Sequence, residues 1–333
     1  MFTLPGLDWE IHAYGLMMAL ALLLAWVVTL SLGRRDRLPP GRLGTAYVLG
    51  VGFGLMGARM AWLLQRPGTD GGAAELFVLR GNELAPFAGV IVMALVAGLY
   101  VMRRRIPVVA VYDVAAPGLA AAVMVERLGA LLSGIGFGDY APKLAWAIRF
   151  PVGSPAYLEH QRALAGLLGP DATQSLPVHP TQLYGLVLAG ITLAVALWVR
   201  KHRRFSGQVF LVTCMTYLLL RALVEDWFRA DAQPAMLGPL NGGQVGALVI
   251  AAAMGVVLWS RGRLAQARPE LFRPWEGGRW SPPDQRPQPV STAAASAETR
   301  QGSSTSGGTS RGSGKGKGKK GKGKKGKKGR RRR

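Results

Sequence analysis

Glu126 and Arg127 stand side by side in an apolar run that begins near Val108. A charged residue at the centre of a membrane-spanning helix costs about 2.5–3.5 kcal/mol on insertion, so such residues usually serve a function. Neighbouring helical residues point about 100° apart. The two are therefore not expected to stack as a pair spaced by four residues would. We expect each to contact another partner, or the helix to break near Gly129 and Gly134.

A second group of polar residues follows a helical period in the segment YLLLRALVEDWFR. Tyr217, Arg221, Glu225 and Arg229 recur every four residues and form one polar stripe on an otherwise apolar helix. Arg and Glu on such a stripe can neutralise each other, which is a purely structural role. The positive excess, together with Arg127, alternatively suits an anionic ligand, because the planar guanidinium fork matches phosphate.

Two further segments carry hydrogen-bonding residues at the start of apolar runs. PVHPTQLYG, residues 177–185, places His179 close to Gln182, and IHAYGLM contains His12 and Tyr14. A single His at a membrane interface serves more often as a cap or anchor than as a catalyst. Tyr in such a position is common in the aromatic belt of membrane proteins.

The elements that must hold these residues are membrane spans. Hydrophobic residues make up 49% of the 333 residues and charged residues only 18%, against about 25% charged in soluble domains. We predict an all-α polytopic membrane protein with about seven transmembrane helices, each long enough to cross the bilayer. The predicted spans are 11–32, 44–65, 86–102, 108–132, 182–199, 207–224 and 243–260.

Basic residues follow the first, third and fifth spans, whereas the alternate loops are poorer in them. By the positive-inside rule, these loops are cytoplasmic, so the N-terminus lies outside and the C-terminus inside. The clusters are Arg34, Arg35, Arg37 and Arg42; Arg103, Arg104 and Arg105; and Arg200, Lys201, Arg203 and Arg204. In this orientation the candidate residues gather in the outer half, with Arg221 deeper, and form an anion-binding cavity.

The chain divides into a membrane domain, 1–273, and a polybasic tail, 274–333, that we expect to be disordered and cytoplasmic. Residues 133–181 are predicted to fold as a small extracytoplasmic cap. The tail is either a solvated extension or a segment attracted to anionic lipid. Its basic run, 311–333, has no interleaved aromatic residues, so nucleic acid is not an expected partner. The single Cys, Cys214, excludes a Cys-rich metal site, and we expect neither a metal nor a cofactor.

Six segments in this order resemble the prolipoprotein diacylglyceryl transferase family of bacterial inner-membrane enzymes, over about residues 9 to 260. HPTQLY is similar to that family's His-Pro-(Ser/Thr)-Gln-Leu-Tyr motif, and RALVEDWFR to its Arg-x-x-x-Glu-x-x-Arg stripe. DVAAPGLAAAVMVERLG resembles its Asp-x-x-Ala-Pro segment and the signature that ends Arg-x-Gly, with Arg127 in the Arg position. The other matching segments are HAYGLM, GLMGARMAW and GGQ.

The resemblance implies transfer of a diacylglyceryl group from phosphatidylglycerol to the lipobox cysteine of preprolipoproteins, with glycerol phosphate as the leaving group. It implies a multi-pass protein of the bacterial inner membrane. Arg127 and Arg221 would hold the phosphate and stabilise charge on the leaving group. Glu225 and Arg229 would orient the stripe, and Tyr14 and Gln182 would donate hydrogen bonds.

The sequence also departs from the family pattern. Ala88 replaces the family's catalytic His, and Gly185 follows QLY where the family often has Glu. In the signature, Glu126 replaces a Gly, and Ala130 and Ser133 replace two Asn. A thiol with a pKa near 8.5 needs a base or a positive field to become a thiolate.

Three hypotheses follow from these matches and departures. The first is an active transferase in which His179, His12 or Glu126 replaces the missing base. The second is a paralogue that binds anionic phospholipid or lipoprotein without transfer. The third is a transporter or another lipid-handling protein on the same scaffold.

Overall fold

The structure is a computed structural model that describes residues 2–3, 10–11, 13–65, 85–164, 166–169, 171–230 and 235–268. Its long helices are α1 (Ala13–Arg35), α2 (Pro40–Leu64), α3 (Pro86–Arg103), α4 (Val108–Ser133), α6 (Thr181–His202), α7 (Gln208–Leu220) and α8 (Gly242–Ala267). A π-helical turn, η2 (Arg221–Glu225), and a 3-10 turn, η3 (Asp226–Phe228), continue α7. Two antiparallel strand pairs complete the elements: β1 (Phe2–Thr3) with β2 (Glu10–Ile11), and β3 (Ala235–Leu237) with β4 (Leu240–Asn241).

Within the described residues, seven helical segments are long and apolar enough to cross a membrane. They coincide with the seven predicted spans, and α7 with its two turns makes the sixth, Gln208–Phe228. Large apolar side chains such as Leu95, Leu132 and Trp198 are about two-thirds exposed, as expected where lipid replaces water around the bundle. The predicted fold class, an all-α polytopic membrane protein, is confirmed.

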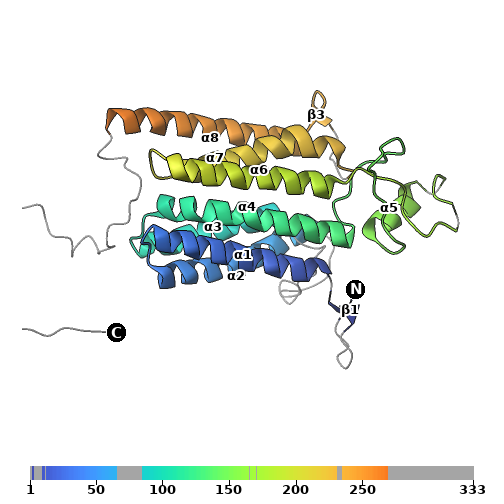
Figure 1. Cartoon of the computed structure of the whole chain (residues 1–333), viewed down its shortest axis with the longest axis horizontal. Coiled ribbons are helices and arrows are strands. Elements are labelled where there is room, and N and C mark those ends of the chain that lie inside the picture. Colours follow the sequence, from blue (N-terminus) through green and yellow to red (C-terminus); the bar gives the residue numbers. More distant parts are fainter. Residues whose placement is uncertain are drawn as a thin grey trace, which may run out of the picture. The chain divides into compact units, whose positions relative to one another are not determined.

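Helix α4 is the central element of the bundle. Its span is 56% buried, against 11% for α3 and α8, and it packs against both α1 and α6 (Figure 1). The close approach of α1 depends on Gly118, because a Cβ there would lie 2.8 Å from the carbonyl oxygen of Ala25. Small residues at helix contacts let membrane helices approach closely, and here they hold α4 where Glu126 and Arg127 face other spans.

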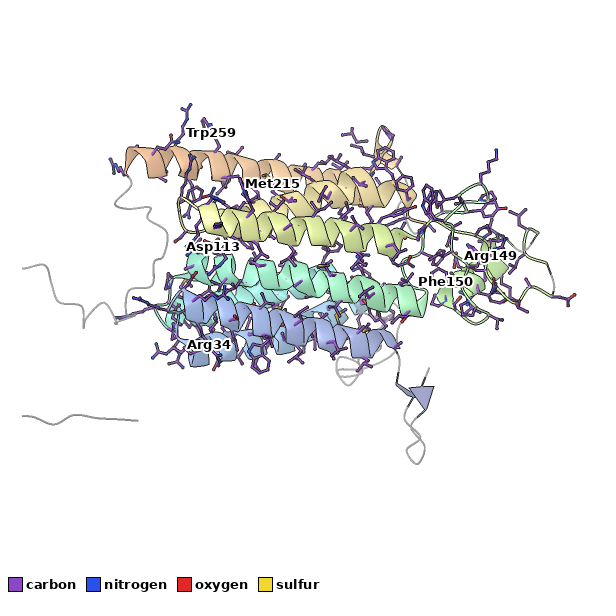
Figure 2. All side chains as sticks on the ribbon, in the orientation of Figure 1. Arg34, Asp113, Arg149, Phe150, Met215 and Trp259 are labelled. Carbon is purple, nitrogen blue, oxygen red and sulfur yellow. The ribbon has the colours of Figure 1, made fainter. Side chains whose placement is uncertain are left out.

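One end of the bundle is held by two buried carboxylates. Asp36, after α1, accepts hydrogen bonds from Arg200 at 2.6 Å and Arg203 at 3.1 Å. Asp113 of α4 is fully buried and accepts from the backbone N–H groups of Gly207 at 2.6 Å and Phe210 at 2.9 Å. These contacts tie the connection between α6 and α7 to α1 and α4. Figure 2 shows Arg34 and Asp113 at this end.

The segment between α4 and α6 lies at the opposite end of the bundle, where Figure 2 labels Arg149 and Phe150. It contains α5 (Pro155–Ala163), which begins where Ser154 Oγ accepts a hydrogen bond from the N–H of Tyr157. Phe150, Ala156 and Val178 form a small buried cluster under it. The predicted boundaries 133–181 and 1–273 stay predictions, and the predicted tail, 274–333, lies outside the described residues.

His160 of α5 connects this segment to the strand-like stretch beside it. The side chain is buried, and its Nδ1 accepts a hydrogen bond from the N–H of Leu176 at 3.2 Å. Burial lowers the pKa of His160 below its ordinary value of 6.5, and the neighbouring carboxylate of Glu159 opposes this shift only in part. The neutral imidazole is therefore the form that the folded segment accommodates.

We predict that this segment loses stability as the pH falls. Because the pKa is lower in the folded state, the unfolded state binds the proton first, so the stabilisation is complete above pH 6.5 and declines below it. Hydrogen exchange of the Leu176 amide, corrected for intrinsic rates between pH 8 and 5, should show weaker protection at low pH. His160→Asn, which keeps an acceptor near the Nδ1 position but does not titrate, should remove this dependence. An equal dependence in both proteins would contradict the prediction.

Candidate functional site

Arg127 lies on α4 and contacts the span formed by α7 and its two turns. Its guanidinium lies 3.1 Å from Glu225 Oε1 and donates a hydrogen bond to the Tyr217 hydroxyl at 3.4 Å. Its Nε lies 3.4 Å from Glu126 Oε2, an ion-pair contact without hydrogen-bond alignment. Arg127 therefore meets the expected separate partners and its chain neighbour as well. The helix continues through Gly129 and ends at Ser133, with Gly134 in the left-handed conformation at φ 66°.

Glu225 is the residue on which the arginines converge. Its carboxylate is 1% exposed, and Oε1 lies 3.1 Å from Arg127, 3.6 Å from Arg221 and 3.3 Å from Arg229. The predicted stripe thus exists, and its charged members contact one another with a spacing of four residues. We call Glu126, Arg127, Arg221, Glu225, Asp226 and Arg229 the arginine–carboxylate cluster.

The π-helical turn adds a contact that a regular α-helix would not favour. Arg221 lies 3.4 Å from Asp226 Oδ1, five residues further along, and i to i+5 is the period of a π-turn. Arg221 also lies over the ring of Phe87 at 5.2 Å, so the start of α3, next to Ala88, borders the cluster. Sequence reasoning missed Asp226 because it assumed a period of four, and the only available signal was its position beside Glu225.

The cluster contains three carboxylates and three guanidinium groups among the described residues. The positive excess expected from the sequence is therefore balanced here by Glu126 and Asp226. The three carboxylates are not equally buried: the Glu126 side chain is 24% exposed, whereas that of Glu225 is 1% exposed. An incoming anion can compete for a guanidinium most easily by displacing Glu126.

Tyr14 joins the cluster from α1. Its hydroxyl donates a hydrogen bond to Glu126 Oε1 at 3.3 Å. Glu126 thus has one oxygen facing Tyr14 and the other facing Arg127. Tyr14 therefore lies beside the cluster, as the sequence predicts. Its hydrogen bond goes to Glu126, whereas the family resemblance implies that Tyr14 donates to the lipid. His12, the neighbouring candidate, lies outside the described residues.

His179 belongs to a separate hydrogen-bonded group. Trp146 Nε1 donates to the Tyr184 hydroxyl at 3.0 Å, and this hydroxyl lies 3.3 Å from His179 Nδ1. Indole N–H can only donate, so the Tyr184 hydroxyl accepts from Trp146, whereas the direction of its contact with His179 Nδ1 depends on the tautomer of the imidazole.

Gln182 also bonds away from the arginines. Its Nε2 donates to the carbonyl of Ile135 at 3.0 Å, while its Oε1 is buried with no hydrogen-bond partner in the described part of the chain. The neighbouring Thr181 hydroxyl donates to the carbonyl of Gly136 at 2.7 Å, and a Cβ at Gly136 would lie 3.6 Å from the Arg229 guanidinium. Gln182 and Thr181 therefore position the loop beside Arg229, and the free acceptor of Gln182 differs from the expected donor role.

Gly185 allows α6 to pack closely against the cluster. A Cβ at this position would lie 2.9 Å from Cδ and Nε of Arg127 and 3.2 Å from Glu225 Oε2. The absent side chain leaves room for Arg127 to reach across to Glu225. The structure thus accounts for Gly in a place where the sequence comparison leads one to expect Glu.

Fold and site together define a seven-span membrane protein with an arginine–carboxylate cluster buried among α4, η2 and the starts of α1, α3 and α6. The family model for prolipoprotein diacylglyceryl transferase matches residues 1–260, and the chain belongs to that family. No group of three metal-ligating side chains is found within the described residues.

Several relatives named phosphatidylglycerol–prolipoprotein diacylglyceryl transferase are similar to the chain. The protein of Verminephrobacter eiseniae is 30% identical over 79% of this chain and 92% of its own length. That of Erwinia tasmaniensis is 28% identical over 78% and 91%. The Thermus thermophilus protein is 31% identical over 54% of this chain and 66% of its own length.

We predict that Gly185→Ala destabilises the protein. The added methyl group must displace the buried Arg127 side chain from its contacts, and overpacking of this kind costs about 1–3 kcal/mol. Thermal unfolding in a fixed detergent measures the change.

Gly190→Ala on the same helix is the matched control. A Cβ there meets only Met124 Cε at 3.7 Å, so the helix-propensity gain of about 0.5–1 kcal/mol should appear alone. Equal melting temperatures for the two variants would contradict the close packing at Gly185.

Proposed function

We propose that the chain transfers the diacylglyceryl group of phosphatidylglycerol to the lipobox cysteine of preprolipoproteins. The observation that carries the proposal is the convergence of Arg127, Arg221 and Arg229 on the buried carboxylate of Glu225. These four residues occupy the motif positions that resemble the family's, and the names of the relatives agree with this activity.

In the proposed complex, the lipid phosphate binds Arg127 and Arg221. Glu225 is too deeply buried to leave, and it keeps the guanidinium groups within reach of one ligand. Glu126 gives way, and its contact with Arg127 Nε is replaced by a phosphate oxygen. Charge-assisted hydrogen bonds from Arg to phosphate are strong and directional, and they stabilise the negative charge that develops on the leaving glycerol phosphate. Arg229 holds Glu225, and the free Oε1 of Gln182 accepts a hydrogen bond from a hydroxyl of the lipid headgroup.

The proposed chemistry is a substitution at carbon. The cysteine thiolate attacks the diacylglyceryl carbon bonded to the phosphate ester oxygen, a carbon–sulfur bond forms, and the carbon–oxygen bond breaks with its electron pair on the leaving phosphate. The thiol proton goes to a base. Glu126 fits this role better than His179, because after the phosphate has displaced it from Arg127 it remains on the partly exposed side of the cluster, whereas His179 belongs to a separate hydrogen-bonded group with Tyr184.

The proposed setting is the bacterial inner membrane, with the N-terminus outside and the C-terminus inside. The basic residues after α1, α3 and α6 support this orientation, since they lie at one end of the bundle and are typical of cytoplasmic ends. The cluster then faces the outer half of the bilayer, where preprolipoproteins emerge. The partners are phosphatidylglycerol and the lipobox signal peptides.

We predict transfer by the purified protein, detected as a diacylglyceryl mass gain on a lipobox peptide incubated with phosphatidylglycerol. Arg127→Ala and Arg221→Ala should each lower the rate about a hundredfold or more, and Glu126→Gln about a hundredfold by removing the base. Arg104→Ala, at the far end of the bundle, should leave the rate unchanged.

The outcomes separate the hypotheses. No mass gain, with a related transferase active in parallel, would contradict the proposal. Transfer that Glu126→Gln leaves unchanged or accelerates would show that Glu126 is only a counter-ion. If Glu126 is the base, Ala88→His should restore part of the rate in the Glu126→Gln background, because the start of α3 borders the cluster, and Ala88→Gln should not.

The second candidate function is binding of anionic phospholipid without transfer. Ala88 in the place of a base and the balanced charges of the cluster favour it. This candidate predicts saturable binding of phosphatidylglycerol that depends on Arg221, with no change in the mass of the peptide. A transporter on this scaffold, the third hypothesis, has no specific observation in its favour.

A further inference from the structure

A groove of about 320 Å³ lies between α6, the start of α7 and α8, near the basic end of the bundle. Trp198, Val199, Phe205 and Leu258 supply apolar surface to it. His202, Arg204, Gln208 and Gln266 supply polar groups. The combination of an apolar floor and several hydrogen-bond donors is typical of a site for an amphipathic molecule.

Arg204 is the only guanidinium that lines this groove, and it has no carboxylate partner in the described part of the chain. Its backbone N–H donates to Gln208 Oε1 at 2.6 Å, which holds the residue at the start of α7. The side chain is exposed, as is that of the adjacent His202. His202 in turn stacks near Trp198, with ring centroids 5.1 Å apart. The described lining includes no Asp or Glu.

The surrounding charge is also positive. Arg200 and Arg203 are held by Asp36, so their charge is partly compensated. Lys201 on α6 and Arg261 and Arg263 on α8 have no acidic partner within the described residues. Arg261 donates to the carbonyl of Ser206, and Arg263 lies 4.5 Å from the ring of Trp259. Among the residues that the structure describes, the arginine–carboxylate cluster is balanced, whereas this end of α6 and α8 has an excess of positive charge.

The flanks of the groove are suited to acyl chains. Leu197, Trp198, Val257 and Trp259 are 43–65% exposed, on helices that face lipid. Tryptophan at this level of a span is typical of the membrane interface. A molecule with a headgroup in the groove could therefore lay its chains along α6 and α8 without leaving the bilayer.

We propose that this groove binds one anionic phospholipid of the leaflet at the basic end, with its phosphate on Arg204 and its chains against the exposed apolar residues of α6 and α8. A zwitterionic lipid fits less well, because no described carboxylate in the groove can pair with its ammonium group. Basic pockets between helices are a known mode of anionic lipid recognition. The site lies at the opposite end of the spans from the cluster and does not depend on the proposed transfer.

The test is photo-crosslinking of the full chain in nanodiscs. Phosphatidylglycerol and phosphatidylcholine, each with a diazirine at the same acyl carbon near the headgroup, are compared, and crosslinked peptides are located by mass spectrometry. We expect phosphatidylglycerol to label peptides within 197–208 and 257–266 preferentially. Arg204→Ala should lower that labelling about tenfold, which corresponds to loss of one charge-assisted hydrogen bond. Labelling near Arg127 should not change, so the two sites are read separately.

A steric variant tests the groove independently of charge. Gly262 lines it, and a Cβ there would meet nothing within 4 Å, so Gly262→Leu starts from open space and extends into the groove. A Cβ at Gly246 on the same helix also meets nothing within 4 Å, and Gly246 lies outside the groove, so Gly246→Leu is the steric control. Arg104→Ala removes a charge at the same end. Gly262→Leu should lower the labelling, and the two controls should not.

Other outcomes overturn the proposal. Equal labelling by the two lipids would do so, as would unchanged labelling in Arg204→Ala or in Gly262→Leu. An equal loss of labelling in the controls would indicate only a general attraction of lipid to the basic end. Competition by glycerol phosphate as effective as that by the intact lipid would also overturn it, because the chains would then contribute nothing.

Discussion

The carboxylate of Glu225 is the interaction on which the candidate site depends. It is almost completely buried and has three guanidinium groups within 3.6 Å. Removing one partner of a buried ion pair costs about 3–5 kcal/mol, because the remaining charges lose their compensation. Arg127 comes from α4 and the other two arginines from the end of the α7 span, so a single carboxylate joins two helices and holds three guanidinium groups together.

The helices around this carboxylate are arranged so that long polar side chains can reach it. Gly185 removes the side chain that would occupy the path of Arg127, and the π-turn brings Arg221 to both Glu225 and Asp226. Glu126 then completes the balance of charge from the more exposed side. The result is a site that is closed by its own carboxylates, and in the proposed function an anionic substrate opens it by displacing the least buried one, Glu126. The excess of positive charge among the described residues lies at the other end of the bundle, where anionic lipid is abundant if that end is cytoplasmic.

The spans and the stripe could be predicted from the sequence because they depend on local patterns. Seven apolar windows of about 20 residues and a spacing of four between Arg221, Glu225 and Arg229 are visible without any neighbouring helix. The contact of Arg127 with Glu225 is one between distant spans, and no spacing reveals it. The contact of Asp226 with Arg221 depends on a change from an α-helical to a π-helical period. The sequence pattern does not predict this change. His179 was placed by its depth in the membrane and Gln182 by its motif position, and neither shows which neighbour a side chain faces.

The most direct test of the central role of Glu225 is the free energy of unfolding of Glu225→Gln in a fixed detergent. This substitution keeps the shape and removes the charge. The account predicts a loss of about 3 kcal/mol or more, because three guanidinium groups lose their shared counter-ion. Glu126→Gln, on the partly exposed side of the same cluster, should lose clearly less. If Glu225→Gln is as stable as Glu126→Gln or as the native chain, Glu225 does not organise the site.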